Sequence, residues 1–405
     1  MRMTFLAVLA ICCFGGSLPE AAPERVGLSS ERLGRIRETM ARHMAEHNIA
    51  GAVTLVARRG QVAHVEAHGM MDAEAKKPMS RNTLFRIWSM TKPVAGVAIL
   101  MLMEEGKVRL NDPVSRFIPE FREMKVAMAR ERAPFYTVPA AREIQVQDLL
   151  SHVSGLASGP MSNAEAAKIP RAYAGTLSDS IPKLGATPLE FQPGTRWAYS
   201  AGAAFDTLGR IVEVASGMPF DRFLRERLFD PLGMKETTFH PTEEQKKRLA
   251  ATYHRAGNAM TRLEAGSRML NLYGDGYAAG AGGLYSTVDE YAAFAQMLLD
   301  GGKGNGKRLL SPKTVELMAS VIVPDTLPGR QPGRAFGLSV QVINDPVAAG
   351  WRVSKGTYGW DGAFGTHFWI DPVEKIVGVM MIQTDNTTRQ LDRDFENAVF
   401  QAIVE

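Results

Sequence analysis

The sequence has few cysteines and no block of basic residues. Only two of its 405 residues are cysteines, Cys12 and Cys13, and both lie in an apolar N-terminal segment. Without that segment the chain has no thiol, so disulfides would not stabilise its fold. The net charge is +4, and no run of Lys and Arg is interleaved with aromatic residues. Nucleic acid is therefore not expected as a partner.

The sequence also lacks an N-terminal apolar run long enough to cross a membrane. The apolar segment 4–14 follows a single basic residue, Arg2, and precedes small residues that could flank a cleavage site. This pattern is typical of an export signal, and the segment is too short for a membrane span. We expect residues 1–22 to be a signal peptide and the protein to be periplasmic or secreted, without stable membrane insertion. The alternatives are a lipid anchor on Cys12 and a cytosolic protein with an apolar start.

No G-x-S-x-G motif occurs, which argues against the nucleophile elbow of α/β-hydrolases. A different nucleophile pattern is present: Ser89 and Lys92 are three positions apart, and Pro93 and a long apolar run follow. Proline fits only the first turn of a helix, so the helix should begin near Ser89. Residues three apart then share one helix face. The pattern predicts a hydroxyl nucleophile with its amine base on a buried helix. Ser180 and Lys183 have the same spacing but lie in loop-like sequence.

Hydrophobic periodicity places strands at both ends of the chain and helices between them. We expect helices at 28–47, 204–215, 220–229 and 288–299, the last with a capping box from Thr287 to Glu290, and strands at 52–57, 61–65, 337–343, 365–370 and 376–382. The predicted fold class is α/β: an antiparallel sheet flanked by helices, with an inserted, mostly helical lobe. We assign 23–405 to one catalytic domain, with an α/β lobe at 23–93 and 300–405 and a helical lobe at 94–299.

Seven ordered motifs support a family resemblance over nearly the whole chain. They are SMTKP at 89–93, DLLSHVSGL at 148–156, FQPGT at 191–195, WAYS at 197–200, DPLGM at 230–234, AGGLYST at 281–287 and GWDG at 359–362. The chain resembles the serine hydrolases related to class C β-lactamases and penicillin-binding proteins, and most of all the β-lactamase-like carboxylesterases (family VIII esterases). This resemblance implies an α/β sandwich lobe beside a helical lobe, with the site between them.

The resemblance assigns the catalytic roles. Ser89 would be the nucleophile, Lys92 would help to remove its proton, and Tyr199 would share the base role and pass the proton to the leaving group. The backbone N–H groups of Ser89 and Ala363 would form the oxyanion hole. Gly362 would allow the substrate to approach closely. The structural alternative for Tyr199 is a packed aromatic residue.

Two positions depart from the β-lactamase pattern. Trp360-Asp361-Gly362 stands where β-lactamases carry Lys-Thr-Gly, so no cation is available there, and Asp361 would repel a substrate carboxylate. Ala201 stands where they carry an amide side chain. Both changes resemble the carboxylesterases, although these usually have glycine at the position of Asp361. Trp360, Asp361, Gly362 and Ala363 are therefore the predicted substrate-binding residues.

The function expected from these residues is hydrolysis of small carboxylic esters through an acyl-enzyme. One alternative is a β-lactamase or a peptidase acting on D-amino-acid peptides; another is a non-catalytic cell-wall-binding protein. The proposed chemistry needs no metal and no organic cofactor. Other histidines give weaker signals: His152 is expected to be structural, and His64 and His68, on one face of a strand, supply only two ligands for a metal.

Overall fold

A large antiparallel sheet organises the molecule. The computed structural model describes residues 17–130, 135–169, 175–267, 270–274, 276–385 and 390–405. The strand order is β12-β13-β14-β15-β16-β1-β2-β3. The bounds are Arg334–Phe336 for β12, Gln341–Ile343 for β13, Tyr358–Asp361 for β14, His367–Asp371 for β15, Ile376–Met381 for β16, Gly51–Arg58 for β1, Gln61–Asp72 for β2 and Lys77–Pro78 for β3. The predicted antiparallel α/β architecture is confirmed.

The centre of the sheet joins the two ends of the chain. Strand β1 pairs with β2 on one side and with β16 on the other, where Leu55 lies opposite Val379. Every residue of β1 is buried, because both faces of the sheet are covered. Alternate residues point to opposite faces, so Leu55 joins one hydrophobic core and Val56 joins another. The expectation that both termini build one sheet is therefore correct.

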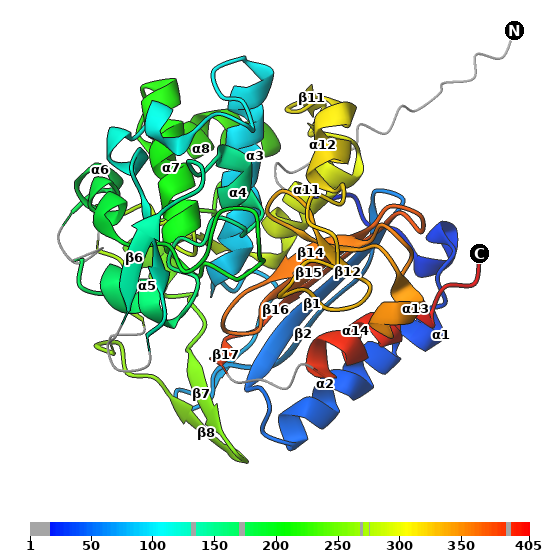
Figure 1. The fold of residues 1–405 in the computed structure, drawn as a ribbon. Helices are drawn as coiled ribbons and strands as arrows, with labels where there is room; N and C mark the ends of the chain where they lie inside the picture. Colours follow the sequence, from blue (N-terminus) through cyan, green and yellow to red (C-terminus); the bar gives the residue numbers. More distant parts are fainter. Residues whose placement is uncertain (1–16, 131–134, 170–174, 268–269, 275, 386–389) are drawn as a thin grey trace, which may run out of the picture.

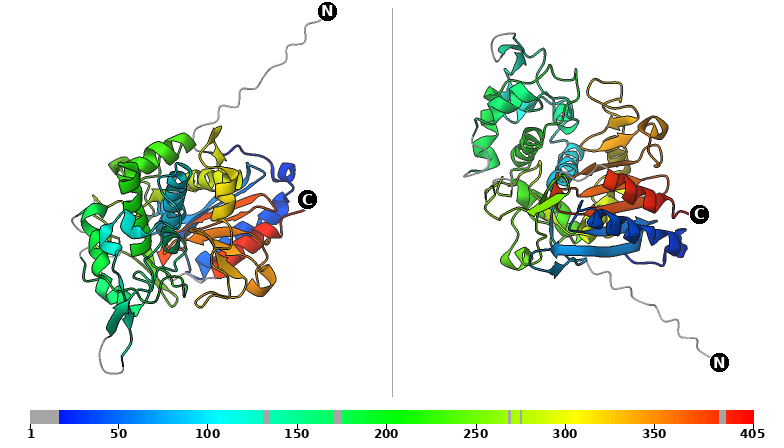
Figure 2. Two further views of the ribbon diagram at one scale, coloured as in Figure 1. Left: turned by 45° about the horizontal axis from the view of Figure 1, so that its top comes forward. Right: turned by 90° about the horizontal axis from the view of Figure 1, so that it is seen from below.

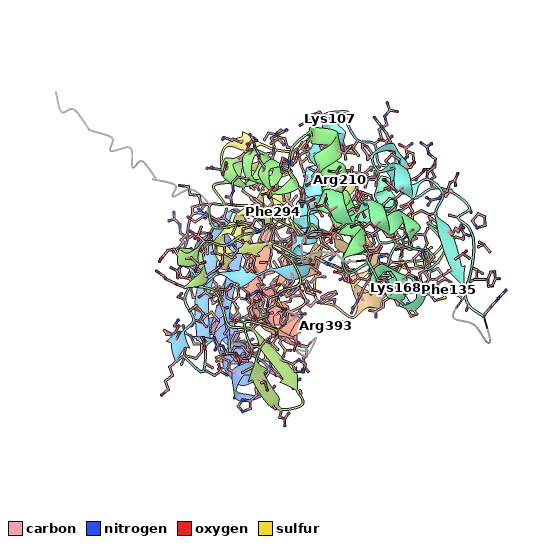
Figure 3. The ribbon with its side chains drawn as sticks, turned by 90° about the vertical axis from the view of Figure 1, so that its left-hand side faces the viewer. Lys107, Phe135, Lys168, Arg210, Phe294 and Arg393 are labelled. Carbon is pink, nitrogen blue, oxygen red and sulfur yellow. The ribbon has the colours of Figure 1, made fainter. Side chains whose placement is uncertain are left out.

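Helices cover both faces of this sheet. Figure 1 shows α2 (Arg35–Ala45) in blue beside α14 (Gln390–Phe400) in red over one face. Helix α11 (Val288–Leu299) packs against β1, β15 and β16 on the other face, and its Phe294 is fully buried there (Figure 3). The sequence-based division placed α11 in the helical lobe, but its apolar residues complete the core of the sheet.

The helical region lies beside the sheet (Figure 2). At its centre α3 (Thr91–Glu104) packs against α7 (Ala203–Ser216). The further helical segments are α4 (Val146–Leu150), α5 (Pro160–Ala166), α6 (Leu177–Ser180), α8 (Phe220–Leu224), η6 (Arg225–Phe229), α9 (Asp230–Leu232) and α10 (Glu243–Lys246), and α12 (Pro312–Met318) and α13 (Pro346–Ala349) follow α11. The small strands are β4 (Phe85–Arg86) with β9 (Tyr285–Ser286), β5 (Lys125–Met128) with β6 (Tyr136–Pro139), β10 (Lys303–Gly304) with β11 (Lys307–Arg308), and β17 (Thr384–Asp385) with β7 (Tyr253–Ala256) and β8 (Ala259–Arg262).

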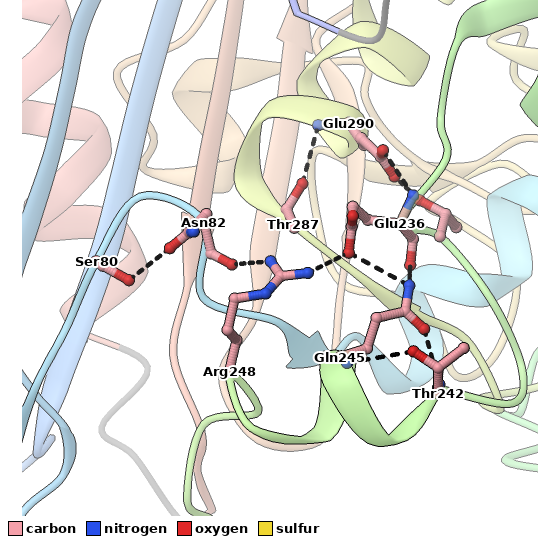
Figure 4. Close-up of polar contacts among 9 residues, drawn as sticks. Ser80, Asn82, Glu236, Thr242, Gln245, Arg248, Thr287 and Glu290 are labelled. Carbon is pink, nitrogen blue, oxygen red and sulfur yellow. Dashed lines mark hydrogen bonds and ion pairs between the residues drawn. The ribbon is translucent and has the colours of Figure 1, made fainter.

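The start of α11 differs in detail from the predicted capping box. The Thr287 hydroxyl accepts the backbone N–H of Glu290 at 3.4 Å, as expected. The Glu290 carboxylate instead accepts hydrogen bonds from the backbone of Glu236 and the hydroxyl of Thr237. Figure 4 shows how Glu236 continues this network to Arg248. Only half of the capping box forms, because the carboxylate fixes a neighbouring loop rather than the helix end.

Two predicted elements are wrong in their extent. The predicted helix 28–47 is divided into α1 (Ser30–Leu33) and α2, with Ser29 capping the first piece. The predicted strand 337–343 contains strand only in β13, because residues 337–340 form a turn in which Ser339 has φ +70°. A Cβ on Gly96 of α3 would lie 2.1 Å from the Ser339 hydroxyl, so this turn packs tightly onto α3. Packing of the turn therefore overrides the apolar alternation of the segment.

The N-terminal prediction falls largely on residues 1–16, which lie outside the described residues. From Pro19 onward the chain contacts the sheet: the Pro19 carbonyl accepts the N–H of Val62, and the N–H of Ala21 donates to the Val62 carbonyl. Within the described part of the chain, no helix has the length and apolar character needed to span a membrane.

Candidate active site

Ser89 and Lys92 lie together at the start of the buried helix α3. Ser89 belongs to a 3-10 turn, Trp88–Met90, that leads directly into α3. The Lys92 Nζ lies 3.0 Å from the Ser89 Oγ. Lys92 is fully buried, and the helix that carries both residues is buried from Thr91 to Leu102. The core therefore fixes the position of this hydroxyl–amine pair, as the sequence spacing predicts.

The other contacts of Lys92 define what its amine can do. The Nζ donates hydrogen bonds to the carbonyl oxygens of Ala201 at 2.9 Å and Ala281 at 2.7 Å. Carbonyl oxygens only accept, so these two contacts use two of the amine hydrogens. In a neutral amine the lone pair would then face the Ser89 Oγ. The arrangement can therefore take a proton from the serine hydroxyl.

Helix α7 holds one of these carbonyls through Asp206. The Asp206 Oδ1 accepts the backbone N–H of Ala281 at 3.0 Å, and its Oδ2 accepts the hydroxyl of Tyr277 at 3.1 Å. Asp206 is almost fully buried. Sequence reasoning missed this residue, although an acidic side chain on an otherwise apolar helix face is a usable signal, because buried charges are costly unless they are hydrogen-bonded.

Tyr199 is a second side chain that contacts the Ser89 hydroxyl. Its hydroxyl is 2.7 Å from the Ser89 Oγ, and its ring lies 4.9 Å from the Lys92 Nζ. Tyr199 comes from the loop that precedes α7, 110 residues after Ser89 in the sequence. The structure thus brings all three predicted catalytic side chains together.

His152 supports the loop that carries Tyr199. Its Nδ1 accepts the backbone N–H of Ser200 at 3.2 Å, and its ring lies 4.7 Å from the Tyr199 ring. Burial, followed by the positive charges of Lys92 and Arg330, lowers the pKa of His152 well below its ordinary value, so the ring is neutral. The expected structural role thus takes a specific form: His152 positions Tyr199.

The predicted oxyanion hole depends on the turn between β14 and β15. The Thr366 hydroxyl donates to the Ile87 carbonyl at 3.2 Å, which ties this turn to the segment before Ser89. A Cβ on Gly362 would lie 2.0 Å from the Thr366 hydroxyl oxygen and 2.6 Å from the Ile87 carbonyl oxygen. Glycine is needed here for packing within the protein, whereas the sequence predicts a need for substrate approach. The turn that contains Ala363 is thus tied to the segment before Ser89.

Trp360 and Asp361, the other two predicted substrate-binding residues, differ from each other in their surroundings. The Trp360 ring lies 5.5 Å from the Tyr199 ring. The Asp361 carboxylate lies 2.5 Å from the Nδ1 of the buried His367, whose Nε2 lies 2.9 Å from Glu396. Burial alone would lower the pKa of His367, but the charges and hydrogen bonds of these carboxylates outweigh it and raise this pKa well above 6.5. Asp361 therefore shares a protonated His367 with Glu396.

A cavity of about 660 Å³ adjoins these residues. Its lining includes Trp197, Trp360, Asp361 and Arg330, and also Arg393 of α14, which Figure 3 labels. The Arg330 guanidinium lies 4.4 Å from the Trp197 ring, and burial lowers the pKa of Arg330 to about 10. Neither Ser89 nor Tyr199 lines this cavity, so it lies beyond Trp360 rather than over the nucleophile.

Comparison with known proteins agrees with this geometry. Residues 36–402 match the sequence profile of the beta-lactamase family. Esterase EstB of Burkholderia gladioli is 30% identical over 366 residues, which cover 85% of this chain and 88% of EstB. A putative D-alanyl-D-alanine carboxypeptidase of Escherichia coli strain K12 is 27% identical, with 94% of this chain and 89% of that protein covered.

A solved structure extends the likeness to the whole fold. EstCE1, described as a hydrolase with promiscuous acyltransferase activity, superposes with a TM-score of 0.78 at 27% identity. The match covers 91% of this chain and 99% of EstCE1. The profile match and the identity to EstB span most of the sequence. The chain therefore belongs to the beta-lactamase family of serine hydrolases.

Proposed function

We propose that this protein hydrolyses small carboxylic esters through an acyl-enzyme on Ser89. The observation that carries the proposal is the cluster in which Lys92 and Tyr199 both contact the Ser89 Oγ, at 3.0 Å and 2.7 Å. Such a cluster supplies an activated nucleophile and two groups that can move its proton.

Two features favour esters over lactams and peptides. Trp360 and Asp361 leave the strand beside the nucleophile without a cation, and Asp361 is already paired with His367. Ala201 offers only its backbone carbonyl, which Lys92 uses. At these positions the protein therefore offers no cation to bind a substrate carboxylate and no side-chain amide to bind a substrate amide. The similarity to EstB and EstCE1 supports the same choice.

In the proposed reaction the Ser89 Oγ attacks the ester carbonyl carbon while its proton passes to Lys92. The backbone N–H groups of Ser89 and Ala363 stabilise the oxyanion that forms. The tetrahedral intermediate then collapses, and the leaving alkoxide takes a proton through Tyr199. Water attacks the acyl-Ser89 ester and gives up a proton to the same groups. The bond between the Ser89 Oγ and the acyl carbon then breaks, the Oγ takes this proton back, and the carboxylic acid is released. Each proton is returned, so no cofactor enters the cycle.

Labelling with a fluorophosphonate tests the nucleophile directly. We expect the wild-type protein to be labelled once and Ser89→Ala to remain unlabelled. Ser180→Ala is the matched control, because Ser180 has the same spacing to a lysine but lies in another element, and it should label like the wild type. Absence of labelling in the wild type would favour a non-catalytic binding protein.

Substrate comparison tests the ester assignment. We expect p-nitrophenyl acetate and butyrate to be hydrolysed with a much larger kcat/KM than a chromogenic cephalosporin. The Escherichia coli relative is named a putative D-alanyl-D-alanine carboxypeptidase, so D-amino-acid peptides are the main alternative substrates to test. A larger kcat/KM for the cephalosporin, or release of D-alanine from a cell-wall peptide, would assign the same Ser89 to amide chemistry.

We also propose that the protein is exported to the periplasm or the medium. The proposal is supported by the apolar segment 4–14 and the small residues that follow it. Cell fractionation and N-terminal sequencing of the full-length protein test it. A mature chain that begins between residues 15 and 23 is expected, and an intact chain in the cytosol would contradict export.

A further inference from the structure

One cluster of metal-binding side chains lies away from the candidate active site. His64, Glu66 and His68 occupy alternate positions of β2, so all three project from the same face of the sheet. Each offers one ligand atom, and these three atoms lie within 4.8 Å of one another. Two histidines and a carboxylate form a common ligand set for zinc.

The neighbouring strand converges on the same point. Thr54 of β1 lies directly opposite Glu66, between His64 and His68. Its hydroxyl oxygen is 3.0 Å from the Nε2 of each histidine. One hydroxyl hydrogen can satisfy only one of two imidazole lone pairs, so Thr54 donates to one ring and accepts from the other. The Thr54 hydroxyl therefore holds the two imidazole rings so that their Nε2 atoms point toward the same place.

The cluster is accessible from one side. A cavity of about 620 Å³ is lined by His64 and Glu66 and by residues 20–22. Arg37 of α2 closes this side through an ion pair with Glu66 at 2.6 Å, but its side chain is 72% exposed and can turn into solvent. His68 is buried beneath the cluster. An ion that enters from the cavity would thus meet His64 and Glu66 directly, whereas His68 does not line the cavity.

We infer that His64, Glu66 and His68 form a binding site for a zinc-like transition-metal cation, with water from the cavity as the fourth ligand. Imidazole ligands favour Zn²⁺ over Mg²⁺ and Ca²⁺, which prefer oxygen. For Zn–ligand distances of about 2.1 Å in a tetrahedral site, the ligand atoms must approach to about 3.4 Å. This requires small side-chain rotations, release of the Thr54 hydrogen bonds, and departure of Arg37 from Glu66.

A second cluster of similar composition lacks a free nitrogen. Asp361, His367 and Asp392 also lie within reach of one another. Both ring nitrogens of His367 already contact carboxylates, Asp361 and Glu396. In the β2 cluster, by contrast, both Nε2 atoms contact only the exchangeable hydroxyl of Thr54 among the described residues.

Calorimetric titration of the untagged, metal-free protein with Zn²⁺ tests the site. We expect one ion per chain, and binding at least ~10-fold weaker in His64→Ala and His68→Ala. His240→Ala is the control, because His240 is an exposed histidine outside the cluster, and it should bind as the wild type does. No binding by the wild type, or equal binding by the His64 and His68 variants, would overturn the inference.

Two further variants separate metal binding from folding. Glu66→Gln keeps the side-chain shape and should weaken Zn²⁺ binding while leaving the metal-free melting temperature close to that of the wild type. Thr54→Val removes the competing hydroxyl and should bind Zn²⁺ at least as tightly as the wild type. Unchanged affinity in Glu66→Gln would exclude this carboxylate as a ligand, and loss of affinity in Thr54→Val would contradict the inference that its hydroxyl competes with the ion. Co²⁺ in place of Zn²⁺ should give the visible absorption of a tetrahedral site.

Discussion

At the scale of single residues, the Ser89 hydroxyl has two partners with different chemistry. Lys92 reaches it from the same helix, and its remaining contacts are carbonyl oxygens that can only accept. Tyr199 reaches it from another element and carries an ionisable hydroxyl. In the proposed reaction one group therefore removes the serine proton, while the other delivers a proton to the leaving group.

Tyr199→Phe tests this division. The substitution removes only the hydroxyl and keeps the ring that packs against His152 and Trp360. We expect kcat for p-nitrophenyl butyrate to fall by about 10²- to 10⁴-fold, the range of general acid–base catalysis, with little change in KM. Tyr285→Phe is the control and should retain full activity. A fall of less than threefold in Tyr199→Phe would remove Tyr199 from the mechanism.

The second residue-scale prediction concerns pH. The pKa of His152 in the folded protein lies well below 6.5, its value when unperturbed. Below pH 6.5 the unfolded chain therefore binds a proton that the folded protein excludes, so acidification favours unfolding. We expect His152 to steepen the loss of unfolding free energy below pH 6.5 by up to about 1.4 kcal/mol per pH unit.

Urea denaturation of His152→Asn at several pH values measures this slope. Asparagine can accept the Ser200 N–H and tolerates the positive φ of this position, 60°, but it does not titrate. The stability of this variant should depend less on pH below 6.5 than that of the wild type, whatever its stability at neutral pH. The exposed-site variant His240→Asn should keep the wild-type slope. Parallel curves for His152→Asn and the wild type would contradict the prediction.

At the scale of elements, the turn between β14 and β15 connects the sheet to the nucleophile segment. Its Thr366 hydroxyl binds the Ile87 carbonyl, and the ring of Phe364 lies 5.0 Å from that of Trp88. Trp88 has φ +46°, an uncommon conformation for a residue with a side chain, immediately before Ser89. The packed turn therefore fixes both the backbone before Ser89 and the predicted donor at Ala363.

Gly362→Ala tests the importance of this turn. The new methyl group would clash with the Ile87 carbonyl oxygen and the Thr366 hydroxyl oxygen, at 2.6 Å and 2.0 Å, so the turn must shift. We expect kcat for ester hydrolysis to fall by about 10²- to 10³-fold, as for loss of one oxyanion donor. Gly266→Ala is the matched control, because a Cβ there meets nothing within 4 Å. Wild-type kcat in a folded Gly362→Ala protein would exclude Ala363 from the oxyanion hole.

At the scale of the whole molecule, the sheet depends on both ends of the chain. The outer face of the sheet is covered by α2 and α14, which come from opposite ends of the sequence. Phe395 of α14 is fully buried, and its ring lies 5.2 Å from that of Trp369 on β15. This layer stabilises the scaffold without touching Ser89.

Phe395→Ala should therefore reduce stability rather than catalysis. We expect the free energy of unfolding to fall by about 3–5 kcal/mol, the cost of removing a large buried side chain. Urea denaturation measures this loss, and kcat at 25 °C should stay close to that of the wild type. Val373→Ala, at a position that is 64% exposed, should change the free energy of unfolding by less than about 0.5 kcal/mol. A loss below 1 kcal/mol in Phe395→Ala would contradict the assigned packing.

The sequence by itself determined the features that depend on local spacing. Pro93 and the three-residue spacing of Ser89 and Lys92 are enough to place the pair at a helix start, because helix geometry is set by near neighbours. The apolar strands at both ends similarly predicted one antiparallel sheet. Family motifs added Tyr199, which local periodicity alone could not have connected to Ser89.

Only the tertiary structure decided which distant groups meet. Asp206 holds the Ala281 backbone, Asp361 pairs with His367, and Thr54 joins two histidines of the next strand. The turn at 337–340 likewise replaces a predicted strand, because its packing on α3 outweighs local alternation. These contacts depend on sheet register and on the packing of whole helices. Residues far apart in the sequence contribute to both, so no local pattern could reveal them.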